Sequence, residues 1–168
     1  MMGRSLLHAL QFLTRLPVPA MAAVDERDAG RSLLWYPLVG LIIGLALAAL
    51  GWMLAGAPPL LRAALVLAAW VAITGALHLD GLGDSADAWM GGLGSRERTL
   101  AIMKDPYCGP GAVVVLVMVL LIKFAALAGI LAAGDWTLLL LAPVLGRVAL
   151  PLLFLTTPYV RPGGLGSA

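Results

Sequence analysis

The stretch LLWYPLVGLIIGLALAALGWML, residues 33–54, decides the fold because it carries no charged side chain. No charge occurs anywhere between Arg31 and Arg62. A helix needs about 20 predominantly apolar residues to cross the hydrocarbon core of a bilayer, so this stretch is long enough. Gly40 and Gly44 lie four residues apart within it, a spacing that lets a second helix approach closely. The stretch therefore predicts a membrane-spanning helix that packs against another.

The composition of the whole chain supports the same interpretation. Apolar residues make up 61% of the 168 positions and charged residues 12%, and the mean hydropathy is +0.98. A soluble domain carries roughly 25% charged residues, so there is too little charge here for a surface that faces water. The single cysteine, Cys108, excludes an internal disulfide and a cysteine metal cluster.

Three further stretches are predicted to cross the membrane. Residues 63–79 are uncharged, whereas residues 112–133 and 137–157 are each interrupted by one cation, Lys123 and Arg147. A cation at membrane depth usually faces the bundle interior or a cavity. Two interpretations of these two cations stay open, which are contact with an anionic substrate and pairing with a carboxylate or carbonyl group.

The N-terminal segment differs from the spans. Apolar residues recur at helical spacing over residues 5–16, which predicts a short helix lying in the membrane interface. The predicted fold is therefore an all-α polytopic membrane helix bundle with about four spans and an N-terminal interfacial helix. Residues 1–168 form one membrane domain, and the glycine-rich ending YVRPGGLGSA, residues 159–168, leads us to expect the N-terminal part of a longer chain.

The basic residues are distributed unevenly between the predicted loops. If all four stretches cross, the N-terminal segment, the 80–110 loop and the C-terminus share one side, and Arg62 lies on the other. Cytoplasmic loops carry an excess of Lys and Arg, so we expect the first side to be cytoplasmic. Its basic residues are Arg4, Arg15, Arg27, Arg31, Arg96, Arg98, Lys104 and Arg161.

An acidic segment, HLDGLGDSAD at residues 78–87, follows the second predicted span. Asp80, Asp84 and Asp87 are spaced by four and three residues, which places them on one face of a helix, where like charges repel. A bound Mg²⁺ would relieve this repulsion, since it prefers oxygen ligands and commonly joins one or two carboxylates to substrate phosphates. The alternative is a solvated helix end. We favour the metal site, within a cytoplasmic, glycine-rich active-site segment at residues 78–111.

Other polar residues surround the aspartates. Arg96, Arg98 and Lys104 suit a polyphosphate substrate, because cations neutralise charge on a transferring phosphoryl group. The alternative for each of them is a membrane anchor on the cytoplasmic side. Asp105 is either a further ligand or a turn residue. His78 is either a base near the metal or an interfacial residue.

The sequence resembles the cobalamin-5'-phosphate synthase family, the adenosylcobinamide-GDP ribazoletransferases, over its whole length. The most specific part is GALHLDGLGDSADA, residues 75–88. The remaining matches are FLTRLPVP (12–19), YPLVGLIIG (36–44), RERTLAIMKDPYCGPGA (96–112), LLIKFAAL (120–127) and RPGGLGSA (161–168).

This resemblance implies an enzyme of a bacterial inner membrane that joins adenosylcobinamide-GDP to α-ribazole or its 5'-phosphate and releases GMP, with Mg²⁺ as cofactor. By motif position, Asp80, Asp84 and Asp87 would bind the metal and the diphosphate. His78, Asp84 and Lys104 are the catalytic candidates, and the substrate-binding candidates are Arg96, Arg98, Lys104 and Asp105. The partners expected are the two substrates and the lipid bilayer, with no nucleic acid; the oligomeric state stays open.

Two other classes of membrane protein share some of these features, CDP-alcohol phosphotransferases and transporters. A CDP-alcohol phosphotransferase also places aspartates on helices at the cytoplasmic interface, but its motif has an Ala-Arg pair soon after Asp-Gly, whereas Asp80-Gly81 is followed by Leu-Gly-Asp. A transporter often shows internal repeats, and this sequence shows no repeat.

Overall fold

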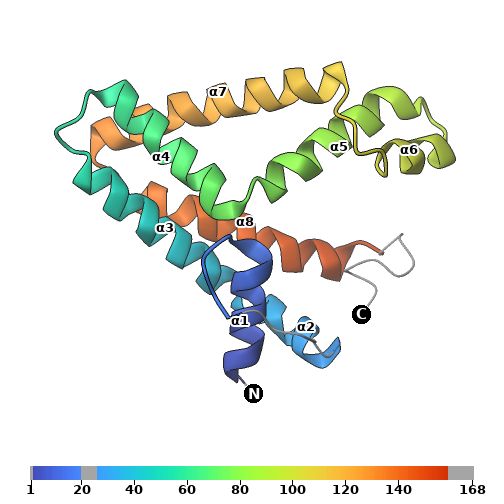
Figure 1. The fold of residues 1–168 in the computed structure, drawn as a ribbon, viewed down its shortest axis with the longest axis horizontal. Helices are drawn as coiled ribbons and strands as arrows, with labels where there is room; N and C mark the ends of the chain where they lie inside the picture. Colours follow the sequence, from blue (N-terminus) through green and yellow to red (C-terminus); the bar gives the residue numbers. More distant parts are fainter. Residues whose placement is uncertain (1, 20–25, 159–168) are drawn as a thin grey trace.

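The computed structural model describes residues 2–19 and 26–158, and every regular element within them is helical (Figure 1). Residues 159–168, which include Arg161 and the glycine-rich ending, lie outside the described residues. The elements in chain order are α1 (Met2–Leu13), α2 (Glu26–Ser32), the short 3-10 helix η1 (Leu33–Trp35), α3 (Tyr36–Met53), α4 (Pro59–Thr74), α5 (Leu77–Gly92), α6 (Arg96–Ile102), α7 (Pro110–Ala133) and α8 (Trp136–Thr156).

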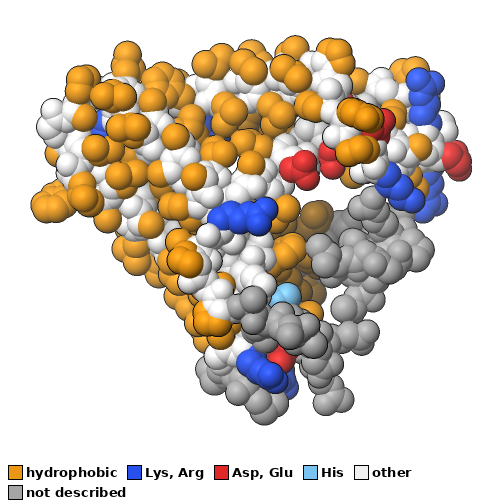
Figure 2. Space-filling model, in the orientation of Figure 1, with side chains coloured by type: hydrophobic (Ala, Val, Ile, Leu, Met, Phe, Trp, Pro, Cys, Tyr) orange, Lys and Arg blue, Asp and Glu red, His pale blue; other side chains and the backbone are white. Residues whose placement is uncertain are grey.

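The described residues contain three helical stretches that are long and apolar enough to cross a membrane, Asp28–Met53, Pro110–Ala133 and Trp136–Thr156. The bent pair of α4 and α5 passes the same test when it is taken as one broken span. Apolar side chains cover most of the face over α3, α4 and α7 (Figure 2). The prediction of an all-α polytopic bundle is confirmed.

The most extensive helix pair joins α3 to α8. A Cβ atom placed on Gly40 would lie 2.7 Å from the carbonyl oxygen of Pro143 and from Cα of Val144. One placed on Gly44 would lie 3.0 Å from Cα of Leu140. The two glycines therefore bring one backbone against the other, as their spacing predicts.

Arg62 joins the ends of several helices at the opposite end of the bundle from the acidic segment. Its Nε donates to the Gly51 carbonyl of α3 (2.8 Å), and its Nη1 donates to the Leu131 carbonyl of α7 (3.2 Å). The guanidinium also lies 5.6 Å from the centre of the Trp136 ring at the start of α8. One side chain of α4 thus satisfies carbonyl groups near two helix C-termini, which otherwise lack intrahelical donors.

The prediction of a continuous second span over residues 63–79 is wrong. α4 ends at Thr74, and α5 leaves it at an angle of 86°. Gly75 and Ala76 adopt left-handed backbone angles, with φ of +60° and +58°. The Gly75 N–H donates to the Ala72 carbonyl and the Ala76 N–H to the Val71 carbonyl, both at 3.1 Å, which is the Schellman pattern of a helix end.

The N-terminal helix is confirmed as a helix, although it covers Met2–Leu13 rather than residues 5–16. Its buried side is formed by Ser5, Ala9 and Leu13, each four residues from the next. This side packs against α2, η1 and α3. Its position in the membrane interface stays a prediction.

The contact at Gly40 leads to a stability prediction. Gly40→Ala should lower the free energy of unfolding by about 1–3 kcal/mol, because the new methyl group meets backbone atoms that cannot rotate away. Gly146→Ala on α8 is the matched control, since no atom lies within 4 Å of a Cβ built there. Chemical unfolding of both variants in lipid bicelles measures the difference, and equal stabilities would contradict the close α3–α8 contact.

Candidate active site

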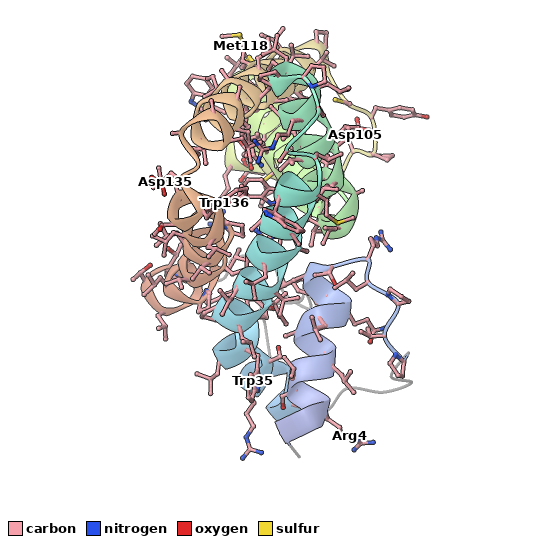
Figure 3. The ribbon with its side chains drawn as sticks, turned by 90° about the vertical axis from the view of Figure 1, so that its left-hand side faces the viewer. Arg4, Trp35, Asp105, Met118, Asp135 and Trp136 are labelled. Carbon is pink, nitrogen blue, oxygen red and sulfur yellow. The ribbon has the colours of Figure 1, made fainter. Side chains whose placement is uncertain are left out.

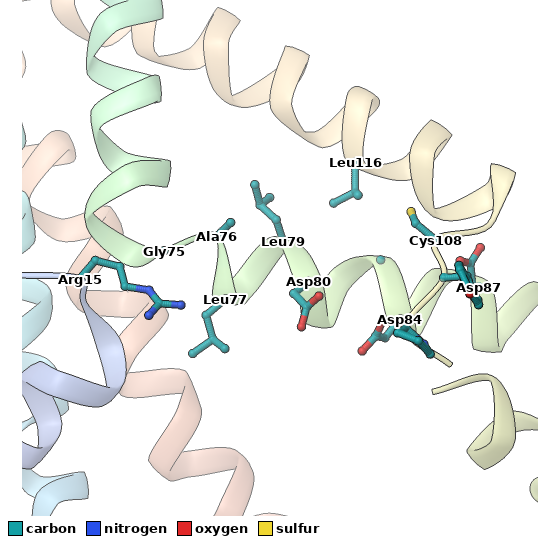
Figure 4. Close-up of a pocket in the computed structure, with 13 residues that line it drawn as sticks. Arg15, Gly75, Ala76, Leu77, Leu79, Asp80, Asp84, Asp87, Cys108 and Leu116 are labelled. Carbon is teal, nitrogen blue, oxygen red and sulfur yellow. The ribbon is translucent and has the colours of Figure 1, made fainter. Parts of the chain in front are cut away.

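Beyond the helix break, α5 runs beside the N-terminal half of α7 (Figure 1). One side of α5 borders a cavity. Asp80, Asp84 and Asp87 all line this cavity, which has a volume of about 430 Å³ (Figure 4). The predicted single face is therefore confirmed. A volume of this size is typical of small-molecule sites.

Asp87 accepts backbone hydrogen bonds with both of its carboxylate oxygens. Oδ2 accepts from the Gly109 N–H (2.6 Å) and Oδ1 from the Ala112 N–H (2.9 Å). A Cβ on Gly109 would lie 2.7 Å from Oδ1 of Asp87, so a larger residue at this position would force the two apart. These N–H groups belong to the start of α7, where a helix lacks internal acceptors and where negative charge is favoured. Asp87 therefore fixes α7 against α5.

Arg15 reaches the cavity from a distant part of the sequence. Its backbone N–H donates to the Ile73 carbonyl (2.7 Å), near the end of α4. Its side chain packs across Gly75, where a Cβ would lie 2.5 Å from Nε, and it points toward the side of α5 that carries Asp80 (Figure 4). Sequence reasoning counted Arg15 only among the basic residues of one membrane side. Its position in the FLTRLPVP motif was the available signal.

The segment between α6 and α7 forms the opposite wall of the cavity with Pro106, Tyr107 and Cys108. Asp105 lies just outside this wall and accepts a hydrogen bond from the Tyr107 N–H at 3.0 Å, which is the geometry of a turn residue.

The predicted substrate-binding residues are exposed in the structure. Arg96 and Arg98 lie on α6, and Lys104 and Asp105 follow it. The described residues that line the cavity include none of these four. Their substrate contacts stay a prediction.

His78 lies in the first turn of α5 and is also absent from the described lining of the cavity. The positive charges of Arg147 and Lys123 act on it. The electrostatic environment of His78 is therefore set in part by two cations of α7 and α8.

The chemistry of the carboxylates suits Mg²⁺. Asp80 and Asp84 supply two hard oxygen donors one helical turn apart, and substrate phosphates and water commonly complete such a site. Within the described ranges, no three His, Cys, Asp or Glu side chains lie close enough together to hold a metal ion without such outside ligands. The metal-ligand roles of Asp80, Asp84 and Asp87 stay predictions, and a metal at Asp87 would share its oxygens with two backbone N–H donors.

The fold and the cavity define a polytopic helical membrane protein with carboxylates arranged along a broken helix. The sequence comparisons give its family. The chain belongs to the cobalamin-5-phosphate synthase family, whose characteristic sequence matches residues 5–168.

Similar proteins carry one enzyme name, adenosylcobinamide-GDP ribazoletransferase. The protein of that name from Pseudomonas aeruginosa strain UCBPP-PA14 is 67% identical over 165 residues, which cover 98% of this chain and 67% of the relative. The Stutzerimonas stutzeri strain A1501 protein is 63% identical over 163 residues, covering 97% and 66% respectively. No solved structure matches the chain. The chain is thus an enzyme of the transferase class and spans about two-thirds of the length of these relatives.

The hydrogen bonds of Asp87 lead to a prediction that separates a structural role from metal binding. Asp87→Asn should lower the free energy of unfolding by roughly 1–3 kcal/mol, because an amide cannot accept from both N–H groups with the same geometry. Asp135→Asn is the control, since Asp135 caps α8 through the Leu138 N–H (3.2 Å) and asparagine is an equally good cap.

Thermal and chemical unfolding of both variants, with Mg²⁺ affinity measured in parallel, decides between the roles of Asp87. Loss of stability with unchanged Mg²⁺ affinity confirms the structural role. Unchanged stability with a weaker Mg²⁺ affinity would show that Asp87 is chiefly a ligand.

Proposed function

We propose that this chain is the catalytic part of a Mg²⁺-dependent membrane enzyme that joins adenosylcobinamide-GDP to α-ribazole or its 5'-phosphate and releases GMP. The name of the similar proteins supports the substrates. The observation that carries the proposal is the row of Asp80 and Asp84 along one cavity, with Arg15 at its inner end.

The proposed reaction is a phosphoryl transfer. The ribazole hydroxyl oxygen attacks the phosphorus on the cobinamide side of the diphosphate, and a new P–O bond forms. The bond between that phosphorus and the bridging oxygen breaks, and GMP leaves with the electron pair. The hydroxyl proton passes to a base on the enzyme.

Asp80 and Asp84 are the residues that would hold Mg²⁺, which supplies charge stabilisation at the transferring and leaving oxygens when bound. Asp84 also lies where it can accept the hydroxyl proton, since it lines the same cavity. His78 and Lys104 lie outside this lining, so their predicted catalytic roles receive no support from the cavity. Arg15 supplies a positive charge suited to a phosphate oxygen.

We also propose that the cavity opens on the cytoplasmic side of a bacterial inner membrane. Arg15 borders the cavity, and α6, which carries the exposed Arg96 and Arg98 and is followed by Lys104, lies beside α5 (Figure 1). Arg62 lies at the other end, where it is bound by helix carbonyl groups. An excess of cations on one side is typical of cytoplasmic loops. Membership of a transferase family favours this function over a transporter.

Metal removal tests the function directly. The protein in lipid nanodiscs should release GMP from adenosylcobinamide-GDP and α-ribazole in the presence of Mg²⁺, and the release should stop when EDTA is added. Chromatography of the products must show a cobalamin. Equal GMP release with and without the metal would contradict a metal-assisted transfer.

The role of Asp84 can be tested by a charge-neutral substitution. Asp84→Asn should lower kcat at least about a hundredfold, the usual range for loss of a general base, with little change in the thermal midpoint. Ser85→Ala is the neighbouring control, because its hydroxyl group bonds only to the Gly81 carbonyl (2.6 Å) among the described residues and lies outside the cavity lining. Activity near wild type in Asp84→Asn would remove this residue from the site.

A further inference from the structure

Arg147 is buried in the middle of α8, although its side chain is always charged. Only 3% of the residue is exposed. Its Nε and Nη2 atoms are fully enclosed and have no hydrogen-bond partner among the described residues. A buried charge without a partner is strongly destabilising, so this guanidinium indicates a binding partner that is absent from the described part of the chain.

Lys123 and His78 lie close enough to Arg147 for its charge to act on both. Lys123 of α7 places Nζ 4.0 Å from the centre of the Trp70 ring, and the charge of Arg147 acts on it. His78 of α5 is exposed, and the charges of both cations reach it. The three side chains come from three different helices. They form one group, called the cationic cluster, in which Arg147 and Lys123 carry the positive charges and His78 adds an imidazole.

The cationic cluster lies at the level of the helix break, because His78 is only two residues beyond Ala76. Broken helices at membrane depth commonly mark substrate sites in membrane proteins, and ionisable side chains at that depth usually face a cavity or a substrate pathway. His78 is exposed, so one member of the cluster lies at the surface of the described part of the chain. These features together fit an anionic ligand rather than a purely structural cluster.

We propose that Arg147, Lys123 and His78 form a binding site for a phosphate monoester, separate from the carboxylate cavity. Two fixed positive charges match the dianion of a monoester, and the planar guanidinium binds two phosphate oxygens at once. On the proposed function, on which this inference rests, the ligand is the 5'-phosphate of a phosphorylated ribazole acceptor. His78 precedes Asp84 by six residues, about 9 Å along a helix axis, which is within the length of a nucleotide.

The first experiment measures phosphate binding without any turnover. The thermal midpoint of the protein in nanodiscs is followed as inorganic phosphate replaces chloride at constant ionic strength, with EDTA present so that no metal bridges the aspartates. Wild type should be stabilised. Arg147→Gln should bind phosphate at least about tenfold more weakly, since a hydrogen bond to a charged group is lost.

Arg62→Gln is the matched control for a buried arginine, because Arg62 is bound by two carbonyl groups and Trp136. It should lose stability yet keep the response to phosphate. Arg147→Lys keeps the charge and should keep part of the response, which guards against a folding defect in Arg147→Gln. No stabilisation of wild type by phosphate, or equal stabilisation of Arg147→Gln, would overturn the site.

The second experiment uses the two acceptors. In Arg147→Gln, the KM for α-ribazole 5'-phosphate should rise at least about tenfold, whereas the KM for α-ribazole should stay within about twofold of wild type. An equal rise for both acceptors would contradict selection by the phosphate. Failure of the proposed reaction itself would abolish turnover with both acceptors while leaving the phosphate response intact, so the two failures are distinguishable.

Discussion

The hydrogen bonding of the backbone around Gly75 and Ala76 is the constraint on which the rest of the structure depends. Within a bilayer, every peptide group has to find its partner inside the protein. Here the last turn of α4 closes on itself through the Val71 and Ala72 carbonyls, and the next carbonyl, that of Ile73, accepts from the N–H of Arg15. The helix can therefore end without leaving these groups unsatisfied, and α5 is free to turn by 86°.

The direction of α5 determines which helices and which cavity its side chains contact. One side places Asp87 against the start of α7 and leaves Asp80 and Asp84 along a cavity (Figure 4). Near the break, the positive charges of Lys123 on α7 and Arg147 on α8 act electrostatically on His78. A straight continuation of α4 would not run along the N-terminal half of α7. Because of the bend, α5 lies beside the start of α7 near Asp87 and near the cations Lys123 and Arg147 at His78.

Much of the bundle could be predicted from sequence, because the absence of charge over long stretches leaves few alternatives to membrane-spanning helices. The spacing of Gly40 and Gly44 likewise predicts a close helix contact, and α8 supplies it. The break could not be predicted this way, since residues 63–79 are uniformly uncharged and Ala76 has no intrinsic preference for a left-handed backbone.

The candidate site was predictable in part. The spacing of four and three residues correctly places the aspartates on one face, but it cannot distinguish Asp87, whose acceptors are used by N–H groups more than 20 residues away in the sequence. Arg15 was missed for the same reason, because its neighbours Ile73 and Gly75 are distant in sequence. Long-range partners of this kind are set by tertiary packing rather than by local pattern.

The hydrogen bonds of Arg62 also have a mechanical consequence. They join α4 to α3 and α7 at one end, where the guanidinium also contacts the ring of Trp136 at the start of α8 (Figure 3). From the short turn at residues 134–135, α7 and α8 diverge (Figure 1). When helices are joined at one end, a given rotation about that end displaces the opposite end of a helix farther the longer the helix is. The start of α7 is also held by Asp87, so a tilt about the Arg62 end moves α8 relative to α7. Over the 21 residues of α8, about 31 Å of helix, each degree of tilt displaces the far end by roughly 0.5 Å.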